Sequence, residues 1–133
     1  MPAMKKGYKA LVEEANAEIE AVTPAEAARL AENEDVLLVD IRDVRELQRE
    51  GKIPGALHAP RGMLEFWVDP ESPYHKEIFS SGKTFIFFCA GGLRSALATK
   101  TVQDMGLSQV KHIEGGFGAW REAGLPIEKP EPK

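Results

Sequence analysis

The sequence predicts a single α/β domain whose sheet is mostly parallel and is covered by helices on both faces. Short apolar runs alternate with helix-like segments along the chain, which is the pattern of such domains. The continuous apolar run Val36–Val39 is typical of a strand buried on both faces, and Thr84–Phe88 is the most apolar of the predicted strands. A chain of 133 residues, of which 43% are hydrophobic, is also long enough to bury one core.

Two helices are predicted before the first clear strand. Apolar residues recur at helical spacing over Tyr8–Ile19, so this segment is expected to form an amphipathic helix. The second helix begins after Thr23, because Thr23 can cap it, Pro24 suits its first position and Glu26 completes a capping box. We expect this helix to reach about Asn33.

The next elements form a strand, a short helix and a second strand. The continuous apolar run Val36–Val39 predicts a buried strand. Asp43 can cap a short helix, which Gly51 stops. A short strand is expected over Leu57–Ala59, because Pro60 prevents its continuation.

Proline and glycine separate the elements of the second half of the chain. Helical stretches end there at Pro70, Gly106 and Gly124. The predicted elements are a helix over Gly62–Val68, a strand over Thr84–Phe88, a helix over Leu93–Met105, a strand over Val110–Ile113 and a helix around Ala119–Glu122.

Composition and charge exclude several classes of function. The formal net charge of −4 gives no support to nucleic-acid binding, for which a basic face is expected. The single cysteine cannot form an intramolecular disulfide. The lysines near the N-terminus are not followed by the apolar run of a signal peptide, and no segment approaches the roughly 18 apolar residues of a membrane span. We therefore expect a soluble, cytoplasmic protein with no nucleic-acid or membrane partner.

Cys89 lies where the predicted strand Thr84–Phe88 gives way to a glycine-containing loop and a helix. A helix N-terminus presents unpaired N–H groups and the positive end of the helix dipole, and both favour a thiolate. Gly91 and Gly92 allow N–H groups to converge into an anion-binding nest, and Arg94 adds a permanent positive charge. The pattern predicts a nucleophilic cysteine and an anion-binding loop formed by Ala90, Gly91, Gly92, Leu93, Arg94 and Ser95.

A purely structural interpretation of the same residues stays open at this point. A free cysteine at the end of a buried strand is usually an inert, small apolar residue. A Gly-Gly pair is usually only a turn, and Arg94 and Ser95 then serve simply as first-turn residues of a helix.

The motifs around this loop resemble those of the rhodanese family of sulfurtransferases. Cys89–Ser95 is similar to the six-residue active-site loop of that family with the helix behind it. Leu38–Arg42 resembles its strand-end Asp-x-Arg, and Glu46 fits the glutamate that commonly follows. The other matching segments are Gly51–Ala56 (with Lys52 in place of the usual histidine), Glu114–Phe117, Ala119–Trp120 and Ala123–Pro126. Together these motifs cover about residues 22–127 in the expected order.

The resemblance implies a rhodanese-like three-layer domain with about five strands over residues 20–128. It would follow an N-terminal helical extension over 1–19 and precede a frayed tail over 129–133. Cys89 would attack the outer sulfur of a donor such as thiosulfate or a persulfide, carry it as a persulfide, and pass it to a thiol or to cyanide. The expected partners are these small molecules, with a protein sulfur acceptor left open, and no cofactor is expected.

Three residues outside the loop are candidates for a supporting role or a substrate contact. Asp40 lies at a strand end near the site, where a carboxylate most often accepts loop N–H bonds. Arg42 is expected to pair with a carboxylate. Arg61 is the better candidate for a substrate contact, because it follows a strand end on the same edge of the sheet.

Other conspicuous residues are given structural roles. The histidines, His58, His75 and His112, form no spaced metal motif, and with one cysteine no zinc site is expected. The aromatic segment from Phe66 to Tyr74 is expected to form either a lid over the pocket or a satellite of the core.

Two other functions remain open on the sequence. A cysteine phosphatase or arsenate reductase has the same kind of loop, but phosphatase loops place five residues between cysteine and arginine. Here Ala90 to Leu93 supply only four, which favours sulfur over phosphate. The second alternative is a sulfur carrier or regulatory binding module that docks on a partner protein through Tyr8–Ile19.

Overall fold

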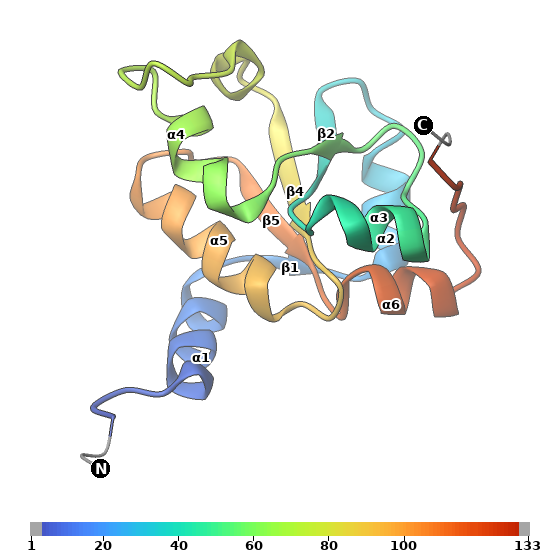
Figure 1. The fold of residues 1–133 in the computed structure, drawn as a ribbon, viewed down its shortest axis with the longest axis horizontal. Helices are drawn as coiled ribbons and strands as arrows, with labels where there is room; N and C mark the ends of the chain where they lie inside the picture. The colour runs from blue at the N-terminus through green and yellow to red at the C-terminus, as the bar shows by residue number, and fades with distance from the viewer. Residues whose placement is uncertain (1–3, 131–133) are drawn as a thin grey trace.

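Five parallel strands form one sheet in the computed structural model, which describes residues 4–130 (Figure 1). Their order is β1-β5-β4-β2-β3, and every neighbouring pair is parallel. The strands are β1 (Ala21–Val22), β2 (Val36–Asp40), β3 (Leu57–His58), β4 (Thr84–Phe88) and β5 (Val110–Ile113). The predicted α/β class is confirmed, and the edge strand β1 is added to it. Two residues are too few for any periodic pattern, so β1 could not be predicted.

The helices follow the predicted order, with differences at their ends. They are α1 (Tyr8–Glu18), α2 (Pro24–Leu30), α3 (Val44–Glu50), α4 (Leu64–Val68), α5 (Leu93–Asp104) and α6 (Gly116–Glu122), with 3-10 turns at Arg61–Met63 and Glu77–Ser80. The prediction that the second helix reaches Asn33 is wrong, because tight bonds from Glu32 N to Arg29 O and from Asn33 N to Leu30 O turn the chain out of α2. Helix α6 begins at Gly116, earlier than Ala119, because Gly115 turns the chain directly from β5 into the helix.

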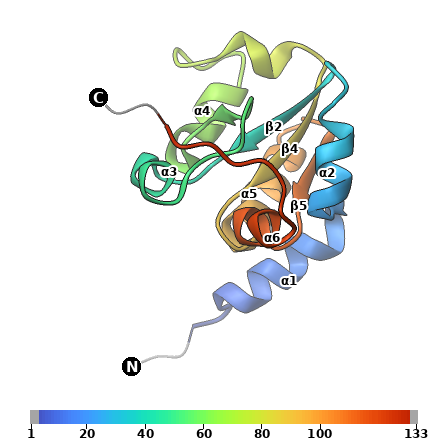
Figure 2. The same ribbon diagram turned by 90° about the vertical axis from the view of Figure 1, so that its right-hand side faces the viewer.

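Helices cover both faces of the sheet, as Figures 1 and 2 show. Side chains alternate along β4, so that Phe85 and Phe87 pack with α4 and α5 while Ile86 and Phe88 pack with α2 and α6. The sheet is therefore buried on both faces, which explains the uninterrupted apolar sequence of its central strand.

Helix α1 packs against α5 outside the two covering layers (Figure 1). Val12 and Ala15 of α1 are buried with Ala96 of α5, and the Gln103 side-chain amide donates a hydrogen bond to Glu18 O at 2.9 Å. The apolar stripe that predicted this helix is thus partly used within the chain, while Tyr8 and Leu11 of the same helix are exposed.

The aromatic segment before β4 is divided between core and surface. Trp67 is partly buried against the main core, whereas Phe66 and Tyr74 are exposed and meet edge to face, with their ring centres 6.5 Å apart.

Near the C-terminus, Glu128 exchanges two backbone hydrogen bonds of 2.8 and 2.9 Å with Lys52. Residues 131–133 of the expected frayed tail lie outside the described residues. Among residues 4–130, no helix has the length and apolar character needed to cross a bilayer.

Candidate active site

Cys89 follows β4 directly, at the carboxyl end of the sheet and between the ends of β2 and β5. The chain leaves β2 toward β3 on one side and leaves β4 toward β5 on the other side. Such a reversal of strand order is where parallel α/β sheets place their ligand sites. Cys89 continues the alternation of β4, so its side chain joins the core on the α5 face and is only 1% exposed.

The sulfur of Cys89 accepts hydrogen bonds from the loop that follows it. The N–H of Gly92 lies 3.1 Å from Sγ and the N–H of Ser95 lies 3.4 Å from it. Gly92 has a φ of +101° and its missing Cβ would come within 3.3 Å of Gly115 N, so the turn requires glycine. Leu93 and Arg94 lie in the first turn of α5, whose N–H groups have no helical partner. The loop therefore offers several donors to negative charge at or beyond the sulfur.

The carbonyl side of the same loop is held by the start of α6. Phe117 N donates to Cys89 O at 2.8 Å and Gly118 N donates to Ala90 O at 3.0 Å. Gly116 makes this approach possible, because it has a φ of +61° and a Cβ on it would lie 2.5 Å from Cys89 O. The β5–α6 glycines thus set the position of the cysteine backbone.

Replacing Gly116 with alanine is expected to displace the Cys89 loop. The left-handed backbone alone costs about 1–2 kcal/mol for a residue with a Cβ, and the clash with the Cys89 and Ala90 backbone adds to it. Gly124→Ala is the matched control, since its φ is +75° and nothing lies within 4 Å of an added Cβ. Urea denaturation should show both variants destabilised and Gly116→Ala more so, and only Gly116→Ala should change the rate at which iodoacetamide alkylates Cys89. Equal behaviour of the two variants would contradict the proposed contact.

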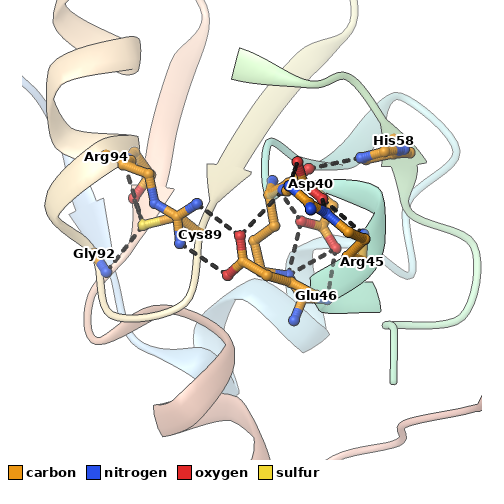
Figure 3. A network of polar contacts seen from close by, with 10 residues as sticks. Asp40, Arg45, Glu46, His58, Cys89, Gly92 and Arg94 are labelled. Atoms are coloured by element: carbon orange, nitrogen blue, oxygen red, sulfur yellow. Dashed lines mark hydrogen bonds and ion pairs between the residues drawn. The ribbon is translucent and has the colours of Figure 1, made fainter. Parts of the chain in front are cut away.

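Arg94 crosses from the loop to α3, where it forms a two-pronged ion pair with Glu46 (Figure 3). Its two terminal nitrogens lie 2.9 and 3.0 Å from the two carboxylate oxygens. These hydrogen bonds hold the pKa of Glu46 below its ordinary value, although partial burial opposes the shift. The same pair raises the pKa of Arg94, and the proximity of Cys89 contributes to that rise. The Arg94 side chain is 43% exposed, so it lies at the rim of the loop and is not enclosed by it.

The Glu46–Arg94 pair has a definite pH dependence. A carboxyl group whose pKa is lowered by folding stabilises the protein above its unfolded-state pKa. That stabilisation is lost as the pH falls through the lowered folded-state value. The pair is therefore complete at neutral pH and releases Arg94 only in acid.

Asp40 and Arg42 form a buried pair behind the loop. Both residues are 1% exposed, and the Arg42 side chain donates hydrogen bonds to both Asp40 oxygens and, at 2.9 Å, to Gly51 O. The guanidinium also lies over the Phe117 ring, 4.1 Å from its centre. Phe117 N in turn donates to the Cys89 carbonyl, so the Asp40–Arg42 pair supports the loop indirectly, through Phe117.

Arg61 and His58 make their polar contacts with groups other than the sulfur. Arg61 pairs with Glu65 on α4 at 2.7 Å, and His58 lies 2.7 Å from Arg42 O through Nε2. No group of three or more side chains of the metal-ligating types is assembled in the part of the chain that the structure describes.

Two contacts at the site were not predicted from the sequence. The place of Glu46 in a motif is visible in the sequence, but no local pattern predicts its pairing with Arg94. The one local signal is the capping box of α3, in which Glu46 accepts from Asp43 N at 3.2 Å and is thereby fixed at the start of the helix. The sequence around His112 indicates neither a metal site nor a partner for its ring, yet its Nδ1 lies 3.0 Å from Ser95 Oγ.

Several known proteins are similar to this chain over most of its length. A model of the rhodanese-like domain matches residues 23–123. A sulfurtransferase from Allochromatium vinosum is 37% identical over 103 residues, covering 77% of this chain and 88% of that protein. The polysulfide-sulfur transferase homodimer of Wolinella succinogenes is 34% identical, with a TM-score of 0.71 over 93% of this chain and 88% of that one.

A further solved structure is similar over almost the whole chain, α1 included. It comes from Rhodopseudomonas palustris, is 61% identical, and has a TM-score of 0.92 over 96% of this chain and 99% of that chain. That protein is described as having unknown function and as a possible tyrosine phosphatase. The similar proteins therefore include two that are named sulfur transferases and one that is described as a possible phosphatase.

Proposed function

The chain belongs to the rhodanese-like domain family, and on that premise we propose that it is a sulfurtransferase. It moves sulfane sulfur from thiosulfate or a persulfide donor to a thiol or cyanide through a persulfide on Cys89. The observation that carries the proposal is the sulfur of Cys89, held by two N–H groups in a loop that ends at Arg94.

The reaction proceeds in two displacements at sulfur. The Cys89 thiolate attacks the outer sulfur of thiosulfate, the S–S bond of the donor breaks, and sulfite leaves with the bonding electron pair. Cyanide or a thiolate then attacks the outer sulfur of the persulfide and the Cys89 thiolate is regenerated. Each step moves one sulfur atom, and the covalent intermediate divides one transfer into two. The loop N–H groups stabilise negative charge at both steps because they are already oriented.

Arg94 supplies the cation at the entrance to the loop. A guanidinium offers a planar set of donors that fits the oxyanion of thiosulfate. Glu46 keeps this side chain beside the loop, and an arriving dianion competes with the Glu46 carboxylate for it.

Arg94→Ala is expected to raise the KM for thiosulfate about tenfold or more, the effect of losing one hydrogen bond to a charged group. The fold should persist, because the Arg94 side chain is half exposed. Arg45→Ala is the control, since it removes an equal charge from α3 at an exposed position paired with Asp43. Steady-state thiosulfate:cyanide kinetics distinguish the two. An unchanged KM in Arg94→Ala would remove Arg94 from the donor site.

Phosphoryl transfer is the enzymatic alternative, raised by the Rhodopseudomonas palustris protein. Two features favour sulfur. Four residues separate Cys89 from Arg94, which makes a smaller ring than a phosphatase loop. An alcohol leaving group also needs a general acid, whereas sulfite leaves without one. Asp40 and Glu46, two of the carboxylates near the loop, are both engaged by arginines.

The proposal is tested by intact-mass measurement of the wild-type chain after treatment with thiosulfate. We expect a gain of one sulfur atom per chain, its loss on addition of cyanide, and formation of an equal amount of thiocyanate. Hydrolysis of p-nitrophenyl phosphate is measured in parallel. A chain that gains no sulfur but hydrolyses the aryl phosphate would overturn the sulfurtransferase proposal in favour of the phosphatase.

A further inference from the structure

The sulfur of Cys89 is linked through one hydroxyl to a buried histidine. Cys89 Sγ lies 3.6 Å from Ser95 Oγ, and Ser95 Oγ lies 3.0 Å from His112 Nδ1. All three side chains are buried, with exposed fractions of 1%, 0% and 4%. The sulfur-transfer steps described above use neither the Ser95 hydroxyl nor His112.

The fold brings these three residues together from three different elements. Ser95 lies in the first turn of α5, immediately behind the cysteine loop. His112 lies on β5, where it pairs with Phe87 of β4, two residues before the cysteine. Because paired residues on neighbouring strands point to the same face of a sheet, His112 lies with Phe87 on the face that α5 covers.

The far side of His112 opens into a cavity beside helix α1. This cavity has a volume of about 450 Å³ and is lined by Val12 and Asn16 of α1, the loop residues 91–93, His112 and Glu114, among others. No hydrogen bond among the described residues involves His112 Nε2. The one buried side-chain nitrogen or oxygen without a partner in that part of the chain is Thr99 Oγ1. His112 Nε2 is therefore in contact with solvent, and His112 is one of the residues that line the cavity.

We propose that Ser95 and His112 carry the proton of the Cys89 thiol to this cavity and so generate the nucleophile. Ser95 touches the reacting sulfur, and His112 acts through Ser95 as a positioning residue. The inference deepens the proposed function, because it rests on Cys89 acting as a thiolate. It also gives α1, which lies outside the matched domain, a role as one wall of the exit.

The proton transfer balances along the chain of three residues. In the thiol state the Cys89 S–H donates to Ser95 Oγ, and the Ser95 hydroxyl donates to Nδ1 of His112. The S–H bond then breaks, its proton replaces that of the serine hydroxyl, and the hydroxyl proton forms an Nδ1–H bond. The proton on Nε2 leaves to water in the cavity. The imidazole ends neutral, the sulfur is negative, and each hydrogen bond is kept with its direction reversed.

The charges around the relay suit a neutral imidazole. Burial lowers the pKa of His112 below its ordinary value, and the Glu114 carboxylate opposes that shift. The residues that α1 presents to the cavity, Val12 and Asn16, are uncharged. On the loop side, Arg94 lies close enough to Cys89 to interact with it, and it is already paired with Glu46. A neutral histidine can pass a proton from one ring nitrogen to the other without the cost of a buried cation.

The test is the pH profile of Cys89 alkylation by iodoacetamide, with the ultraviolet absorbance of the thiolate measured in parallel. Ser95→Ala and His112→Phe are expected to move the midpoint upward by about one pH unit, a tenfold loss of rate below the midpoint. Ser95→Thr keeps the hydroxyl and should restore the wild-type profile. Thr99→Val is the matched control, since it removes a buried hydroxyl one turn further along α5 that has no partner.

Superimposable profiles for the wild type and Ser95→Ala would overturn the relay. A shift in Ser95→Ala without one in His112→Phe would overturn the role of His112 and leave only a serine contact. If His112→Phe does not fold, His112→Leu takes its place, because leucine likewise has no group that can donate a hydrogen bond to Ser95. Alkylation requires no sulfur donor, so a failed relay and a failed sulfurtransferase are separate outcomes.

Discussion

Cys89→Ser is expected to abolish thiosulfate:cyanide transfer, with a loss of more than about 10³-fold, since removing a covalent nucleophile costs up to about 10⁶-fold in other enzymes. A hydroxyl does not form the persulfide on which both displacements depend. The measurement is initial-rate formation of thiocyanate, together with intact mass after donor treatment. No sulfur should be added to the variant chain.

The fold of Cys89→Ser should be preserved, which makes the loss of rate interpretable. The serine oxygen replaces a sulfur that is 1% exposed and can accept the same two N–H bonds from Gly92 and Ser95. The urea midpoint of the variant is therefore expected to stay close to that of the wild type. Transfer within tenfold of the wild-type rate would show that another group carries the sulfur.

Arg42→Met is expected to destabilise the chain by about 3–5 kcal/mol, the usual cost of leaving one partner of a buried ion pair uncompensated. It leaves the Asp40 carboxylate buried without its guanidinium, and it removes the donor to Gly51 O and the contact with Phe117. The free energy of unfolding is measured by urea denaturation.

Two further variants separate the buried charge from other effects. The double variant Asp40→Asn with Arg42→Met removes both buried charges, and the asparagine oxygen can still accept the hydrogen bond from the backbone N–H of residue 42. It should therefore be less destabilised than Arg42→Met alone. Arg45→Met breaks the Arg45–Asp43 ion pair, which joins the same two residue types at the same spacing, but the Arg45 side chain is 81% exposed. The urea midpoint of this variant should therefore hardly change. A double variant as unstable as the single one would contradict the explanation by buried charge.

Much of the fold was predictable because its signals are local. The strand Thr84–Phe88 and the strand Val110–Ile113 were predicted with the bounds that the structure has, since turn residues stand on either side of each of them. The capping boxes at Thr23 and Asp43 are present as expected. Helix ends were less certain, because the turn after Leu30 depends on i to i+3 bonds that no sequence motif marks.

The candidate site was predictable as a place but not as a set of contacts. The loop from Cys89 to Arg94 is contiguous in sequence, so its residues and their spacing are visible directly. The partner of Arg94 is Glu46, 48 positions away, and that of Ser95 is His112, 17 positions away. Neither pairing follows from a local pattern, because the sheet order decides which elements lie beside the loop.

By itself, therefore, the sequence determined that a lone cysteine ends a buried central strand and is followed by four residues and an arginine. It also determined the α/β class, because alternation, caps and glycines act over a few neighbouring residues. Only the tertiary structure decided that Arg94 is held at the rim by Glu46, that Gly116 fixes the Cys89 carbonyl, and that the sulfur is joined through Ser95 to His112. These contacts exist because the folded sheet brings α3, α5, α6 and β5 to one edge. The residues in contact are far apart in the sequence, so no local pattern predicts them.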